Sequence, residues 1–251
     1  MTEASLYFRA RALKCGAWIW VIILCSGMVG VNEVTLTGRI ELQNRGKSDK
    51  APEATSTVVW LTPVGDAPDS LTTTGRFLQH PRLVQKNKSF DPHILVVPVG
   101  SVVEFPNRDP FFHNVFSLFE GKRFDLGLYE AGSTRNVHFD KPGISYIFCN
   151  IHPEMSAIVI ALDTPYYAVS NGHGELVIPG VPAGRYLLRV WSEASLPENL
   201  RGMAREITVS ESTPSLGIIR LTGTDLPHTH KNKYGQDYEP PAPASPVYER
   251  P

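Results

Sequence analysis

From residue 34 onward, apolar and polar positions alternate in short runs that Gly, Pro, Asn and Asp residues separate. Alternation with a period of two predicts β-strands, and no stretch shows sustained helical periodicity. The strands expected in the first part of the chain are Val34–Leu42, Thr57–Leu61, Arg82–Gln85, Ile94–Val99, Ser101–Pro106, His113–Leu118, Ser133–Phe139, Gly143–Cys149 and Ala157–Leu162. Their spacing predicts an all-β fold, a Greek-key sandwich or barrel over residues 31–163 with a loop insertion at 62–80.

A second, smaller β-sandwich is predicted over residues 164–222. Its expected strands are Tyr166–Val169, Glu175–Ile178, Arg185–Trp191 and Arg205–Thr222, with Gly-containing turns between them. From about residue 223 the composition changes to Pro, His, Lys, Asn and Tyr with few aliphatic residues. Because such a segment cannot bury enough apolar surface to offset chain entropy, residues 223–251 are expected to form a Pro-rich tail that is disordered or loosely docked.

Residues 1–30 differ in composition from the rest of the chain. Three basic residues precede a run without charge over residues 15–29, and small residues near the end of the run, at 25–27 and 30, offer cleavage positions. This order is typical of an export signal, and the run is shorter than the ~20 residues of a membrane-spanning helix. Trp18 and Trp20 leave an uncleaved N-terminal anchor open as the alternative. Both interpretations place the body of the protein outside the cytoplasm, for example in a periplasm.

Charge and cysteine content narrow the possible functions. The chain of 251 residues has 24 basic and 25 acidic residues, scattered along it, so no nucleic-acid-binding patch and no polybasic membrane arm is indicated. Cys15 and Cys25 belong to the N-terminal segment, which leaves Cys149 alone in the body. A lone thiol in an oxidising compartment forms no internal disulfide, so we expect it to be buried or bound to a metal.

The surroundings of Cys149 favour a metal. Cys149, His152 and Met155 lie within seven residues at the end of an expected strand. Two imidazoles, a thiolate and a weak axial thioether suit an ion that cycles between Cu(II) and Cu(I). The second imidazole is assigned to His113, at the start of a different strand that a Greek-key sandwich can bring nearby. Strand alternation places Ile147 and Cys149 on one face, so the thiol is expected to point into the end of the core.

With these residues in place, the stretch 82–163 resembles the cupredoxin (plastocyanin-like) family. Its Cys-x-x-His-x-x-Met spacing is similar to that of amicyanin, and Asn114 follows His113 as in that family. The wider run 34–191 resembles bacterial plastocyanin-like proteins of the methylamine-utilisation type. Those proteins commonly carry a carboxypeptidase-regulatory-like β-sandwich after the copper domain, which here corresponds to residues 164–222.

The resemblance implies one type 1 (blue) copper ion bound by His113, Cys149, His152 and Met155. It implies that Asn114 uses hydrogen bonds to hold residues 149–155, termed the ligand loop. It also implies that His152 lies near the surface as the route for the electron. Ile151 and Pro153 would form part of a small apolar docking patch. Four aromatic side chains are expected to exclude water from the metal, namely Phe111, Phe112, Phe116 and Phe148.

The function indicated is that of an exported electron carrier between a redox donor and a redox acceptor protein, not an enzyme. A copper delivery or storage protein is the alternative. A copper oxidase or nitrite reductase needs a further metal site with additional histidines, and a thiol hydrolase based on Cys149 and His152 leaves Met155 without a role. Four other histidines are expected to be exposed or structurally bonded, namely His80, His93, His138 and His173. His228 and His230 in the tail could bind a metal loosely.

Overall fold

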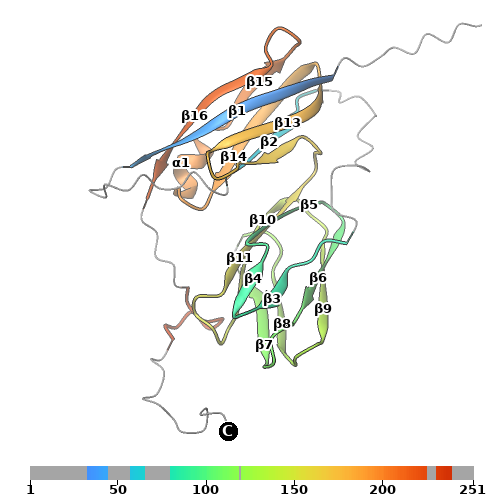
Figure 1. Ribbon diagram of the computed structural model, residues 1–251, viewed down its shortest axis with the longest axis vertical. Coiled ribbons are helices and arrows are strands. Elements are labelled where there is room, and N and C mark those ends of the chain that lie inside the picture. Colours follow the sequence, from blue (N-terminus) through green and yellow to red (C-terminus); the bar gives the residue numbers. More distant parts are fainter. Residues whose placement is uncertain (1–32, 45–56, 66–79, 119, 225–229, 239–251) are drawn as a thin grey trace, which may run out of the picture. The chain divides into compact units, whose positions relative to one another are not determined.

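The computed structural model describes residues 33–44, 57–65, 80–118, 120–224 and 230–238 (Figure 1). The prediction of an all-β fold is confirmed for these residues, which form sixteen strands and one five-residue helix, α1 (Pro197–Arg201). Among them no helix is both long enough and apolar enough to cross a membrane. The expected export signal at residues 1–30 and most of the expected loop insertion at 62–80 lie outside the described residues.

The first sandwich contains a five-stranded sheet and a two-stranded sheet. The larger sheet has the order β5 (Ile94–Pro98), β11 (Ser156–Leu162), β10 (Gly143–Phe148), β7 (His113–Ser117) and β8 (Phe124–Tyr129), and the smaller one pairs β6 (Ser101–Pro106) with β9 (Thr134–Phe139). Two short strands, β3 (Val84–Lys86) and β4 (Ser89–Asp91), form a hairpin beside β6. Phe105, Phe139 and Ile147 from both sheets share one hydrophobic core.

Strands β5 and β11 pair in parallel and are buried on both faces. Along β11, Ala157, Val159 and Ala161 belong to the core of the first sandwich. The alternating residues Ile158, Ile160 and Leu162 belong to a second core cluster. A strand that is buried on both sides has no polar alternation, which explains its continuous apolar sequence.

The second sandwich consists of a three-stranded and a four-stranded sheet. The three-stranded sheet has the order β13 (Glu175–Pro182), β1 (Glu33–Asn44) and β16 (Ser215–Gly223). The four-stranded sheet has the order β12 (Tyr167–Val169), β2 (Thr57–Pro63), β14 (Gly184–Ser192) and β15 (Arg205–Val209). The structure differs here from the sequence-based boundaries, because β1 and β2 were assigned to a copper domain over residues 31–163. Strand propensity is local, whereas the choice of partner strand depends on packing between distant segments.

Further differences concern individual strands and the tail. The expected strand over residues 205–222 is divided into β15 and β16, and β8 was not predicted. The tail was expected to be disordered or loosely docked, yet residues 230–238 make specific contacts with the first sandwich. Tyr238 and His230 supply the aromatic surface that the count of aliphatic residues overlooked.

Candidate metal centre

The pairing of β7 with β10 brings two distant parts of the sequence together. His113 is the first residue of β7, and Cys149 directly follows β10. Phe116 pairs with Phe148 in antiparallel register, so the start of one strand lies beside the end of the other. His113 and Cys149 are both 0% exposed. As predicted from strand alternation, Ile147 and Cys149 belong to the same core.

Three donor atoms converge at this end of the sheet. The Nδ1 atom of His113 lies 3.6 Å from the Cys149 Sγ atom, and the Nδ1 atom of His152 lies 3.5 Å from the same sulfur. The three donor atoms all lie within 4.8 Å of one another. A metal bonded at about 2.3 Å to sulfur and about 2.0 Å to nitrogen, with angles of about 110–120°, separates S and N by about 3.5–3.7 Å. The observed separations therefore fit a bound metal, and the donor set fits copper.

Met155 closes the ligand loop. The Cys149 N–H donates to the Met155 carbonyl at 3.2 Å, and the Met155 N–H donates to the His152 carbonyl at 3.1 Å. The Met155 side chain is buried in the same core as Cys149. Its backbone thus fixes the loop, while its role as an axial thioether ligand stays a prediction.

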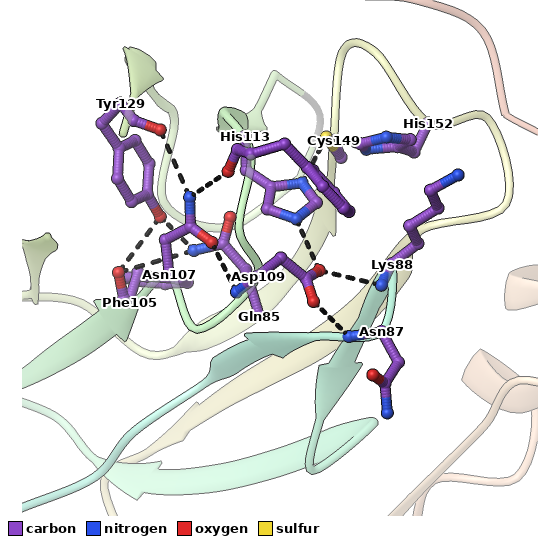
Figure 2. Close-up of polar contacts among 11 residues, drawn as sticks. Gln85, Asn87, Lys88, Phe105, Asn107, Asp109, His113, Tyr129, Cys149 and His152 are labelled. Carbon is purple, nitrogen blue, oxygen red and sulfur yellow. Dashed lines mark hydrogen bonds and ion pairs between the residues drawn. The ribbon is translucent and has the colours of Figure 1, made fainter. Parts of the chain in front are cut away.

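A buried carboxylate holds the His113 imidazole. The Nε2–H of His113 donates to the Asp109 Oδ2 atom at 2.8 Å, and Asp109 also accepts the backbone N–H groups of Asn87 at 2.6 Å and Lys88 at 2.9 Å (Figure 2). A proton on Nε2 leaves the lone pair of Nδ1 directed at the Cys149 sulfur. Carboxylate partners of this kind set the tautomer and orientation of metal-binding histidines.

The loop that carries Asp109 has its own hydrogen-bond network. The Asn107 side chain accepts the Asp109 N–H at 3.0 Å and donates to the carbonyls of Phe111 at 2.8 Å and Tyr129 at 3.3 Å. The Tyr129 hydroxyl accepts a hydrogen bond from Gln85 and donates one to the Phe105 carbonyl at 3.1 Å (Figure 2). All but the partly buried bond to Phe111 lie in the interior, where an unmade hydrogen bond is costly, so the loop before His113 is held in one conformation.

Burial and hydrogen bonding tune the ionisable groups of the site. Burial lowers the pKa of His152 to about 4, with further lowering by His113 and Lys88. Burial also raises the pKa of Cys149, although nearby backbone N–H groups oppose this effect. Burial works to raise the pKa of Asp109, but hydrogen bonds from Lys88, His113 and Asn87 outweigh it and the pKa lies below its usual value. His152 is therefore neutral at pH 7, as a metal ligand must be, and the thiol needs a cation nearby to lose its proton.

The aromatic surroundings agree in part with the prediction. The Phe111 ring lies 5.2 Å from the His113 ring and 5.7 Å from the His152 ring, centroid to centroid, so it covers both imidazoles. Phe116 and Phe148 pack on each other beside the strand ends. Phe112, in contrast, is 56% exposed and does not shield the site as expected. An aromatic pair in a loop gives no strand alternation from which the inward side chain could be chosen.

The structure also shows the contacts of the other polar residues named in the prediction. The Asn114 side chain donates to Asp125 on β8 at 2.7 Å, and the Asn114 backbone is hydrogen-bonded to the Cys149 sulfur. His93 bonds the Ser156 carbonyl and Glu193, and His138 is exposed. Sequence reasoning did not assign a role to Asp109, although a carboxylate four residues before a proposed histidine ligand is a signal for such a contact.

Comparisons with known proteins give limited matches. No protein-family model matches the chain, and no curated protein matches it. A purple cupredoxin from Nitrosopumilus maritimus is 23% identical, with a TM-score of 0.31, and the match covers 33% of this chain and 99% of that one. An oxidised amicyanin variant is 20% identical, with a TM-score of 0.32 and coverage of 33% and 82%. These neighbours are cupredoxins.

A copper-containing nitrite reductase from Thermus scotoductus SA-01 is 26% identical, with a TM-score of 0.32. The match covers 40% of this chain but only 25% of the reductase. The TM-scores are low for all three structures. We therefore base the assignment of the site on the geometry of its own residues.

Proposed function

We propose that this chain is a type 1 copper protein that carries single electrons between redox partners outside the cytoplasm. The observation that supports it is the set of His113, Cys149 and His152, of which the first two are buried, and whose donor atoms have the separations that a bound metal requires. A copper ion supplies reversible one-electron chemistry in such a set, with Met155 as the weak axial ligand.

The surrounding residues are suited to electron transfer. Asp109 and the hydrogen bonds around Asn107 hold the ligands of the site in place, so little rearrangement accompanies a change in charge. Phe111 packs against both imidazoles and shields them in part from water. His152 is partly exposed, and Ile151 next to it is 43% exposed. An exposed apolar side chain beside a partly exposed ligand fits short-lived docking of a partner protein.

A thiol hydrolase fits this site poorly. Nucleophilic cysteines have a lowered pKa and are accessible, whereas Cys149 is fully buried and burial raises its pKa. Among the described residues, no other group of three His, Cys, Asp or Glu side chains has metal-binding geometry. We therefore propose electron transfer rather than catalysis.

The remaining parts of the proposal concern location and the second sandwich. The basic and then apolar sequence of residues 1–30 supports export, with membrane contact only if that segment is retained. The strands of residues 164–222, joined by β1 and β2, are proposed to form the carboxypeptidase-regulatory-like domain. Redox donor and acceptor proteins in the same compartment are the proposed partners.

Copper loading tests the proposed function directly. We expect the purified protein with one equivalent of Cu(II) to show intense visible absorption from thiolate-to-copper charge transfer. This absorption should disappear on addition of a mild reductant and return on reoxidation. Absorption and paramagnetic resonance spectra measure it. A colourless protein that holds only Cu(I) would instead support copper delivery, and one that prefers zinc would contradict the proposal.

The Met155→Leu variant tests the axial ligand. We expect it to keep its copper and to have a higher reduction potential, because the lost donor stabilises Cu(II) more than Cu(I). A rise on the order of 60 mV corresponds to a tenfold change in relative affinity for a one-electron couple. Voltammetry measures the potential, and Met203→Leu in the second core is the matched control. Complete loss of copper from Met155→Leu would contradict the assigned role.

A further inference from the structure

Residues 230–238, here termed the C-terminal strap, lie against the ligand loop. The Tyr238 hydroxyl donates to the backbone carbonyl of Cys149 at 2.9 Å. The backbone N–H of Lys233 donates to the Asn150 Oδ1 atom at 2.8 Å. Two consecutive residues of the ligand loop are therefore bonded to a segment about eighty residues away in the sequence, and one of them is the thiolate ligand itself.

Aromatic contacts anchor the strap beside the strand ends. The ring of His230 stacks on Phe148 with a centroid distance of 4.3 Å and an angle of 31°. It also lies 6.2 Å from the Phe116 ring and meets the Tyr238 ring edge-on at 5.4 Å. Phe116 lies in the strand that begins with His113, and Phe148 is the last residue of the strand that Cys149 follows. The strap thus packs on the pair of strands that brings the ligands together.

An ion pair connects the strap to the His113 side of the site. The Lys233 Nζ atom lies 2.8 Å from the Asp125 Oδ2 atom, and the other oxygen of Asp125 accepts a hydrogen bond from Asn114 at 2.7 Å. Asn114 directly follows His113 in β7. Through Lys233 the strap therefore reaches both segments that supply ligands.

The ligand loop has few backbone–backbone hydrogen bonds of its own, and the backbone groups of Ile151 and His152 are bonded to the Cys149 sulfur. Its internal backbone bonds are those between Cys149 and Met155 and between Met155 and His152. The carbonyl of Cys149 finds its partner in Tyr238. Fixing that peptide group fixes the direction of the Cys149 side chain, and small changes in ligand direction alter metal affinity and potential.

We infer that the C-terminal strap is part of the metal centre, with Tyr238 and Lys233 as positioning residues that hold the ligand loop in its metal-binding conformation. The inference rests on the proposed copper function for its consequence, but the contacts between strap and loop are made by protein groups alone. A test on metal-free protein can therefore fail or succeed independently of the copper assignment.

The test compares Tyr238→Phe and Lys233→Met with Tyr234→Phe in the full chain. Tyr234 lies in the same strap but is 72% exposed, which makes it the matched control. We expect amide hydrogen exchange of residues 149–155 in metal-free protein to rise about two- to tenfold in Tyr238→Phe, the effect of one lost hydrogen bond. Lys233→Met should show a smaller rise because its ion pair is partly exposed.

In copper-loaded protein, Tyr238→Phe should release copper to a chelator faster than Tyr234→Phe and shift the reduction potential. A strap that only stabilised the fold would lower the unfolding temperature without moving the potential or the exchange of residues 149–155 relative to strands β10 and β11. That result, or equal exchange in all three variants, overturns the inference. Absence of a visible band in the unsubstituted protein overturns the proposed function instead, while the exchange measurement still decides the role of the strap.

Discussion

The Cys149→Ser variant, loaded with copper, should lose the intense visible absorption of the unsubstituted protein and remain a folded β protein. The band arises from charge transfer between thiolate and Cu(II), and a serine hydroxyl supplies no comparable donor orbital. Cys149 is fully buried, so the introduced hydroxyl is expected to cost about 1–3 kcal/mol of stability. This is less than the total of about 5–15 kcal/mol that is typical of a folded protein.

Absorption spectroscopy measures the loss, and near-ultraviolet circular dichroism together with thermal unfolding reports whether the variant folds. Cys25→Ser in the full chain is the matched control, because that residue belongs to the N-terminal segment. It should keep the band unchanged. A visible band of normal intensity in Cys149→Ser would remove Cys149 from the ligand set and with it the type 1 assignment.

The ligand loop could be predicted from the sequence because its information is local. Cys149, His152 and Met155 occupy one short segment, and the preceding strand alternation places Cys149 on the core side. His113 is separated from Cys149 by 36 residues. Its assignment rested on the expected Greek-key arrangement and on the resemblance to a known family, because the sequence does not state that β7 and β10 are neighbours.

The features that could not be predicted from the sequence depend on contacts between distant segments. Strand β1 has the alternation of any half-buried strand, and its pairing with β13 and β16 follows only from the packing of the second core. The strap has too few aliphatic residues to signal order, but Tyr238 and His230 dock on a surface that the folded sandwich provides. Composition indicates how much apolar surface a segment can bury by itself. It does not indicate how much surface the segment can bury against a neighbouring folded domain.

The largest effect expected outside the ligands themselves is that of Asp109→Asn. We expect copper affinity to fall about 10- to 100-fold, as is typical for a residue that orients a metal ligand. Asp109 receives three hydrogen bonds, from His113, Asn87 and Lys88. Asparagine has one acceptor oxygen and a donor NH₂ group, so at least one of these N–H groups would face another donor. The neutral amide would also accept more weakly than the carboxylate, so the His113 imidazole would be held less firmly in its orientation toward the Cys149 sulfur.

Competition with a chelator of known affinity measures the effect, and Asp140→Asn is the matched control. Asp140 is an exposed carboxylate that pairs with Lys122, so its substitution should leave copper affinity unchanged. The reduction potential separates positioning from simple loss of stability. Removing a buried negative charge next to His113 destabilises Cu(II) more than Cu(I), so the potential of Asp109→Asn should rise. Unchanged affinity and potential in this variant would show that His113 needs no carboxylate to hold it, and that the Asp109 contact serves only the loop fold.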